Sequence, residues 1–127
     1  MKNQIINTSK APQSIGAYNQ AVISNGFVFT AGQVPIDPDT GNLIEGNFKE
    51  RVRRVLMNLK SILEEAGTNL SNVAKFTVFL TDISNYTEVN EVFNEFIRDS
   101  EAPARSLIEV SSLPAGADIE IDCIAAF

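Results

Sequence analysis

The spacing of apolar residues in this chain changes along the sequence from helical steps to strict alternation. Between residues 48 and 66, apolar side chains recur every three or four positions, which predicts an amphipathic helix. Asn47 and Glu50 suit a capped start for this helix, and Gly67 suits its end. The same spacing predicts a second helix over residues 86–98. Its buried face is expected to consist of Tyr86, Val89, Phe93, Phe96 and Ile97.

Alternating segments in the first two thirds of the chain predict strands. Residues 18–24 and 27–33 flank Asn25-Gly26, which favours a tight hairpin because both residues tolerate positive φ. Residues 37–42 form a loop by composition. A further strand is predicted over residues 73–80. Its inward side chains are expected to be Ala74, Phe76, Val78 and Leu80.

The last quarter of the chain contains two more alternating segments, residues 105–110 and 118–124. Each segment has one apolar set and one set that carries charge. The charged sets are Arg105, Leu107 and Glu109 in the first segment, and Glu120, Asp122 and Ile124 in the second. Strands aim side chains better than loops do, so these sets are candidates for a binding site.

The predicted order of elements is hairpin, helix, strand, helix, strand, strand, which indicates one α+β domain over residues 1–127. The two helices can cover only one face of the sheet. The other face would mix charges with apolar groups, so we expect a partner chain to cover it. This face is expected to carry Lys75, Thr77, Phe79, Arg105, Leu107, Glu109, Glu120, Asp122 and Ile124. The short connection between the last two strands favours their pairing as a hairpin.

Composition narrows the possible chemistry. The chain has 44% hydrophobic residues, which is typical of a globular protein. It has no histidine, so zinc hydrolysis and histidine-based triads are disfavoured. Its single cysteine, Cys123, is on an apolar strand face, where a buried hydrophobic role is favoured. The net charge of −6 opposes nucleic-acid binding, and we interpret the basic cluster of Arg51, Arg53 and Arg54 as a solvated helix face.

The sequence contains no apolar run of the roughly 20 residues that a membrane-spanning helix needs. The first ten residues resemble neither a signal peptide nor a mitochondrial presequence. We therefore expect no membrane partner and a cytoplasmic location.

Arg105 and Glu120 are the candidate catalytic pair. Taken alone, Arg105 suits a surface salt bridge after a proline, and Glu120 suits a solvated strand carboxylate. A guanidinium beside a carboxylate on a rigid sheet could instead hold a small carboxylic acid and direct water at it. A carboxylate close to a guanidinium would stay ionised at neutral pH, as a general base requires.

Four segments resemble the Rid (reactive intermediate deaminase) family of the YjgF type. They are residues 11–21, residues 31–38, residues 78–83, and the A-P-A-R-S motif with its later I-E-I run. The resemblance implies a chorismate-mutase-like α+β fold that forms a homotrimer, with helices outside, sheets inside and a cleft at each subunit interface. It also implies that the strand over residues 73–80 lies between the last two strands. Arg105 and Glu120 would then lie on strands about 10 Å apart.

The resemblance further implies hydrolysis of 2-imino acids such as 2-aminoacrylate, 2-iminopropanoate and 2-iminobutanoate. Pyridoxal-phosphate enzymes release these compounds, and no cofactor or metal is implied for their hydrolysis. Arg105 would bind the substrate carboxylate and Glu120 would direct or deprotonate the attacking water. The implied substrate-binding positions are Tyr18, Gly32, Asn90, Arg105 and Leu107. Asn90 is equally compatible with an exposed polar position on the second helix.

Two positions depart from the family pattern. Leu107 stands where many members have cysteine, so a thiol role is excluded there and the pocket is expected to be drier. Ala31 stands where many have serine, which removes a hydroxyl contact.

Two other functions are compatible with these residues. The first is a trimer that binds 2-oxo acids or other small carboxylates without turnover, in which Glu120 has no chemical task. The second is an RNA-directed nuclease or translation inhibitor, which the acidic composition and the absence of histidine disfavour.

Overall fold

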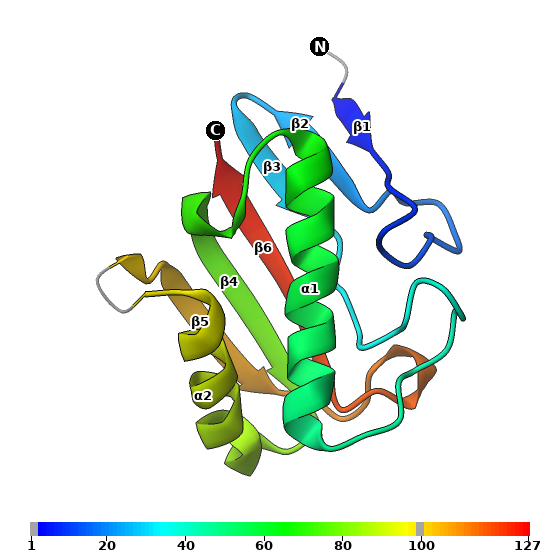
Figure 1. The fold of residues 1–127 in the computed structure, drawn as a ribbon, viewed down its shortest axis with the longest axis vertical. Helices are drawn as coiled ribbons and strands as arrows, with labels where there is room; N and C mark the ends of the chain where they lie inside the picture. Colours follow the sequence, from blue (N-terminus) through cyan, green and yellow to red (C-terminus); the bar gives the residue numbers. More distant parts are fainter. Residues whose placement is uncertain (1–2, 99–100) are drawn as a thin grey trace.

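The structure, a computed structural model, describes residues 3–98 and 101–127. These residues form one six-stranded mixed sheet with two α-helices (Figure 1). The strand order is β1-β2-β3-β6-β4-β5, with β4 and β5 parallel and the other neighbours antiparallel. The strands are β1 Gln4–Ile6, β2 Ala21–Ser24, β3 Phe27–Thr30, β4 Val73–Leu80, β5 Ala104–Glu109 and β6 Ile119–Ala126.

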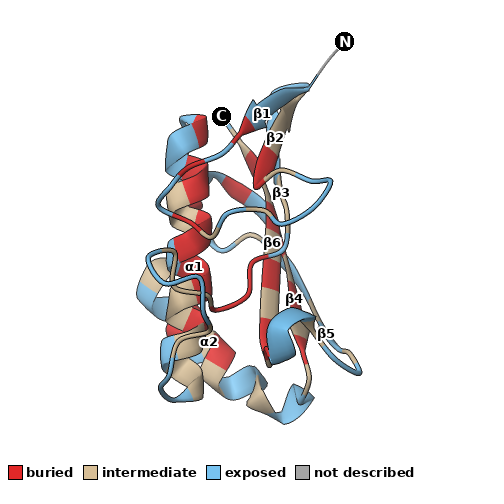
Figure 2. Ribbon diagram, turned by 90° about the vertical axis from the view of Figure 1, so that its right-hand side faces the viewer, coloured by how far each residue is buried: buried red, intermediate tan, exposed pale blue. Residues whose placement is uncertain are grey.

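The first helix, α1, spans Phe48–Ala66 as the apolar spacing predicts. The Asn47 side chain accepts a hydrogen bond from the backbone N–H of Glu50, and Gly67 ends the helix in the left-handed region at φ 92°. Both predicted caps are therefore confirmed. Seen edge-on, both helices lie on the same side of the sheet, and the core lies between the two layers (Figure 2).

The second helix, α2, spans Tyr86–Phe96 and is shorter than predicted, because Ile97 is extended at φ −134°. Val89, Val92 and Phe93 are its buried residues. The prediction of a buried Tyr86 is wrong, since this side chain is 53% exposed and lines a surface cavity. Tyr86 occupies the first turn of α2, and its ring borders that cavity and not the core.

The β2–β3 hairpin turns at Asn25 and Gly26, which both have positive φ as predicted. In the centre of the sheet, β4 lies between β5 and β6. The hairpin pairing suggested by the short connection is therefore wrong, and the strand order implied by the family resemblance is confirmed. The three-residue strand β1 at the sheet edge was not predicted, since a segment so short carries little alternation.

The side of the sheet that β5 presents to the helices differs from the prediction. Arg105 pairs with the buried Phe76 of β4, and Leu107 pairs with the buried Val78. Directly paired residues point to the same side of a sheet, so Arg105, Leu107 and Glu109 face the helices. Because β5 is an edge strand with mostly exposed residues on both faces, alternation separates its two sets without showing which set faces inward.

A β-bulge between Val73 and Lys75 also changes which side chains at the start of β4 point toward the helices. Val73 is buried there, and Ala74 is exposed, contrary to the prediction. The face of the sheet without helices is therefore partly apolar as predicted, but some of the residues on it differ from the predicted ones. Its exposed large apolar side chains are Ile5, Phe27, Phe29 and Ile108. Neither helix in the described part of the chain is long and apolar enough to cross a bilayer.

Candidate active site in two halves

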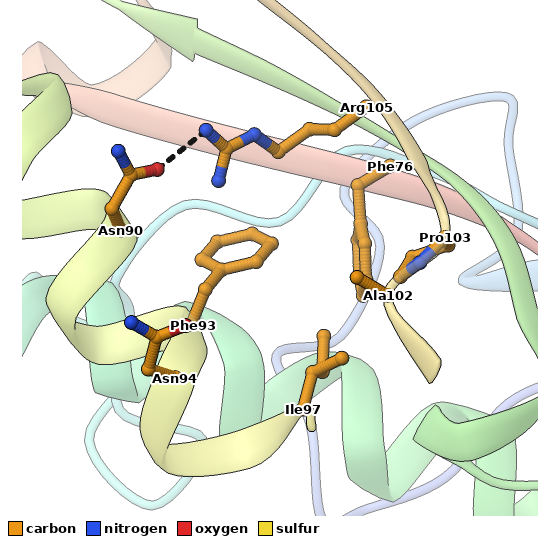
Figure 3. Close-up of a pocket in the computed structure, with 8 residues that line it drawn as sticks. All are labelled: Phe76, Asn90, Phe93, Asn94, Ile97, Ala102, Pro103 and Arg105. Atoms are coloured by element: carbon orange, nitrogen blue, oxygen red, sulfur yellow. Dashed lines mark hydrogen bonds between the residues drawn. The ribbon is translucent and has the colours of Figure 1, made fainter. Parts of the chain in front are cut away.

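Arg105 forms the first half of the candidate site, on the helix side of the edge strand β5. Its Nη2 donates a hydrogen bond of 2.6 Å to Oδ1 of Asn90 on α2 (Figure 3). The guanidinium carbon lies 5.0 Å from the centroid of the Phe93 ring. Asn90 and Phe93 are three residues apart on α2, so the helix presents both to the same arginine. These two contacts hold the long Arg105 side chain in one orientation.

The positive charge of the Arg105 guanidinium is not neutralised by an ion pair within the described residues. Burial lowers the pKa of this side chain, because a charge loses solvation when water is removed. The arginine nevertheless stays cationic, because its ordinary pKa is far above neutral. None of the ion pairs among the described residues includes Arg105. An exposed cation that is held by an amide oxygen and an aromatic ring, and that has no ion-pair partner among the described residues, is suited to bind an anion.

Arg105 borders two cavities. One, which we name the Phe93 cavity, has a volume of about 360 Å³ and is shown in Figure 3. It is lined by Phe76, Asn90, Phe93, Asn94, Ile97, Ala102, Pro103 and Arg105. The other, which we name the Leu107 cavity, has a volume of about 480 Å³. It is lined by Asp82, Ile83, Ser84, Tyr86, Arg105 and Leu107.

Glu120 forms the second half of the candidate site, on the opposite face of the sheet. It pairs with Phe79 of β4, so it points away from the helices. With Tyr18 and Gly32 it borders a third cavity of about 600 Å³, which we name the Glu120 cavity. Burial raises the pKa of Glu120, and the neighbouring carboxylate of Asp122 raises it further. The carboxyl group that would activate water is therefore more easily protonated than an ordinary glutamate.

Gly32 is held close to the Glu120 side chain. A Cβ atom at position 32 would lie 2.7 Å from Cδ of Glu120 and 2.8 Å from Oε2. No real Cβ contact is that short, so a side chain at this position would displace the carboxylate. The close approach explains in physical terms why glycine suits this position.

We expect Gly32→Ala to lower the rate of any reaction that uses Glu120 by on the order of 10²-fold, since displacement of a catalytic group by about 1 Å has that effect. Gly16→Ala is a suitable control, because a Cβ atom there meets the Tyr18 ring at 3.4 Å, within ordinary contact. Steady-state kinetics and thermal unfolding of both variants would check the prediction. Wild-type activity in Gly32→Ala would show that the Glu120 position is not critical.

Two buried amides that the sequence analysis missed support the walls of the Glu120 cavity. The Gln20 side chain accepts a hydrogen bond from the N–H of Thr8 and donates to the carbonyls of Thr8, Ala11 and Pro12. Asn58 of α1 donates to the carbonyls of Val34 and Ile36. Both amides are almost fully buried, and they anchor loops whose residues line the cavity. The sequence signal for Asn58 was its position as a polar residue within the apolar stripe predicted for this helix.

The turn that closes another part of the Glu120 cavity is strained. Ala115 has a φ of 60°, in the left-handed region that a residue with a Cβ seldom adopts. It lies in the short turn Pro114–Gly116 before β6, and both Pro114 and Ala115 line the cavity. Such strain is often found at functional sites, where the surrounding structure maintains it.

The structure brings the predicted site residues together as two groups. Tyr18, Gly32 and Glu120 share one cavity, whereas Arg105 borders two other cavities, with Asn90 at one and Leu107 at the other. The prediction that Arg105 and Glu120 share the uncovered face is wrong. Because β4 separates their strands and the register turns them to opposite sides, they do not meet within one chain.

Two further predictions concern charges and the cysteine. The basic cluster on α1 is partly used within the fold, since Arg51 pairs with Asp118 and Arg53 with Glu95. Cys123 is buried as predicted, and burial raises the pKa of its thiol to about 12. The thiol is therefore protonated and unreactive at neutral pH.

Comparisons with known proteins agree on one family. Residues 8–127 match the family model described as Endoribonuclease L-PSP. The chain is 47% identical over 125 residues to a RutC family protein of Pyrococcus abyssi, with 98% of each chain covered. It is 42% identical over 122 residues to the 2-iminobutanoate/2-iminopropanoate deaminase of Rattus norvegicus, covering 96% of this chain and 88% of that protein.

The fold also matches a solved structure over its full extent. The crystal structure of YyfA from Yersinia pestis, described as a member of the conserved Rid protein family, superposes with a TM-score of 0.95 and 41% identity. The match covers 99% of this chain and 100% of that one. This chain therefore belongs to the Rid (YjgF, L-PSP endoribonuclease) family.

Proposed function

We propose that this protein hydrolyses 2-imino acids to 2-oxo acids and ammonia, at a site that two copies of the chain form together. The observation that carries the proposal is the exposed Arg105 guanidinium, which Asn90 and Phe93 hold in place and which has no carboxylate partner among the described residues. The rat relative named as an imine deaminase supports the reaction type. The substrate carboxylate would supply the missing counter-charge.

The division of the site between two faces supports an assembly in which a neighbouring copy completes it. The face without helices exposes Phe27, Phe29 and Ile108, which a second copy could cover. An interface that joins unlike surfaces of identical chains generates a closed ring when the rotation permits it. In such a ring the Arg105 edge of one copy meets the Glu120 cavity of the next. We propose that this ring is a homotrimer.

The chemistry needs one anchor and one base. Arg105 binds the carboxylate through two parallel N–H donors, which match its planar geometry. Glu120 accepts a proton from water while the water oxygen forms a bond to the C=N carbon and the π electron pair moves to nitrogen. The protonated Glu120 then returns that proton to nitrogen, which gives a carbinolamine. Glu120 next takes the proton of the carbinolamine hydroxyl and passes it to nitrogen, while the C=O bond forms and the C–N bond breaks, so that ammonia leaves and a 2-oxo acid remains. Imines are reactive electrophiles, so positioning and one base, worth about 10² to 10⁴ in rate, are sufficient.

A mixing experiment tests both the reaction and the shared site. Arg105→Ala and Glu120→Ala would each be assayed with an imine generated by a pyridoxal-phosphate dehydratase, with formation of the 2-oxo acid followed. Each variant alone is expected to be inactive. After unfolding and joint refolding in equal amounts, about one quarter of the interfaces in a closed ring would pair an intact Arg105 with an intact Glu120.

Recovery of roughly that fraction of the wild-type activity would support the shared site. Inactive mixtures that contain demonstrably mixed oligomers would contradict it. Wild-type turnover no faster than spontaneous hydrolysis would contradict the deaminase proposal and favour a carboxylate-binding protein. The family description as an endoribonuclease calls for an RNA cleavage control, and a net charge of −6 leads us to expect neither binding nor cleavage.

A further inference from the structure

The two cavities beside Arg105 offer different surroundings to the side chain of a bound 2-oxo or 2-imino acid. In the Phe93 cavity, Asn90 already accepts a hydrogen bond from the guanidinium, and the Phe93 ring lies against its carbon (Figure 3). The Leu107 cavity lies along β5 from Arg105 and is the larger of the two. A ligand anchored on the arginine can extend into it without displacing either contact.

Leu107 forms an apolar wall of that cavity. It lies two residues after Arg105 on the same side of β5, which corresponds to about 7 Å along the strand. Part of its side chain packs on the core, and the rest borders the cavity beside the exposed Ile83 and Tyr86. The distance from the guanidinium and the apolar surroundings suit the carbon chain of a small acid whose carboxylate is bound by Arg105.

Asp82 in the Leu107 cavity disfavours a negatively charged ligand side chain. Oδ1 of Asp82 accepts hydrogen bonds from the N–H of Ser84 at 3.0 Å and from its hydroxyl at 2.6 Å. These bonds from Ser84 lower the pKa of Asp82, so this carboxyl is negatively charged at neutral pH. A second carboxylate on the ligand would be repelled by it.

We propose that Leu107 determines side-chain specificity, and that the cavity it borders selects acids with apolar side chains from ethyl to isobutyl over dicarboxylic ones. As a statement about catalysis, this inference rests on the proposed function. As a statement about binding, it can be tested with stable 2-oxo acids. Each methylene group buried against Leu107 should improve affinity about fourfold.

The test is a binding series measured by calorimetry on the full chain. The probes are pyruvate, 2-oxobutanoate, 4-methyl-2-oxopentanoate, 3-hydroxypyruvate and 2-oxoglutarate. The wild type is expected to bind 4-methyl-2-oxopentanoate tightest and 2-oxoglutarate weakest. In Leu107→Ala, the preference for 4-methyl-2-oxopentanoate over pyruvate should fall by at least the fourfold of one methylene group.

Ile97→Ala is the matched control, because Ile97 is also a partly buried residue packed on the core but borders the Phe93 cavity. It is expected to keep the wild-type order of affinities. Leu107→Thr, whose β-branched side chain suits a strand but is shorter and carries a hydroxyl, should weaken the preference for 4-methyl-2-oxopentanoate and serves if Leu107→Ala fails to fold. A flat series in the wild type, or a preference lost in Ile97→Ala and kept in Leu107→Ala, would overturn the inference.

Turnover distinguishes this inference from the proposed function. If the wild type hydrolyses none of the corresponding imines, the deaminase proposal fails, and the binding series still decides the role of Leu107. If the imines are hydrolysed with the same kcat/KM whatever the side chain, the deaminase proposal stands and the specificity inference fails.

Discussion

Replacing Glu120 by glutamine is expected to lower kcat for imine hydrolysis by about 10² to 10⁴-fold, with little change in KM. The substitution keeps the size of the side chain and removes its ability to accept a proton from water. Binding of 2-oxo acids should remain, because Arg105 is unchanged. Steady-state kinetics with a dehydratase-generated imine, together with calorimetry of 2-oxobutanoate, would measure both effects. An unchanged kcat would remove Glu120 from the mechanism.

The pH dependence gives a second measure of the same group. The base must be ionised, so activity is lost as the pH falls through the pKa of Glu120. Burial and the nearby Asp122 both raise that pKa, which moves the loss to higher pH than for an ordinary glutamate. Asp122→Asn removes the negative charge that repels ionised Glu120. The decrease in kcat at acidic pH, which is the acidic limb of the pH profile, should therefore move to lower pH. A limb that stays in place would show that another group controls it.

Replacing Arg105 by lysine is expected to raise KM and the Kd of 2-oxo acids by about 10- to 100-fold, the range of one to two charge-assisted hydrogen bonds. Lysine keeps the charge but loses the planar fork, the hydrogen bond to Asn90 and the placement over Phe93. The effect should be larger on KM than on kcat, because the carboxylate is bound in both the ground state and the transition state.

Arg53→Lys is the control for this substitution. Arg53 forms an exposed ion pair with Glu95 on the helix surface, away from all three cavities. We expect its kinetics to match those of the wild type. Wild-type KM in Arg105→Lys would indicate that Arg105 has a structural role and that the anchor lies elsewhere.

Local elements were predictable where a short stretch of sequence contains the whole cause. The ends of α1 follow from the cap at Asn47 and the left-handed Gly67, and the β2–β3 turn follows from Asn25 and Gly26. In these cases the deciding hydrogen bonds and dihedral angles involve residues within a few positions of one another. The end of α2 was predicted too far along the chain and the strand β1 was not predicted, because both depend on weaker local signals.

The candidate residues could be named from the sequence, and their arrangement could not be predicted. The motif resemblance led to Arg105, Asn90, Tyr18, Gly32 and Glu120, and the structure places each of them at a cavity. Alternation correctly separated the two faces of β5 and of β6. It could not show that the Arg105 set and the Glu120 set are on opposite sides of the sheet, because that depends on how each strand pairs with β4.

The amino-acid sequence by itself determined the helices, the hairpin and the chemical types at the candidate site: a guanidinium at position 105 and a carboxylate at position 120, in a chain without histidine. Only the tertiary structure decided that the cation and the carboxylate lie on opposite faces, and that Gly32 abuts Glu120. The physical reason is that side-chain direction in a sheet follows from the register between strands far apart in the chain. A shift of that register by a single residue would move every side chain of β5 to the other face.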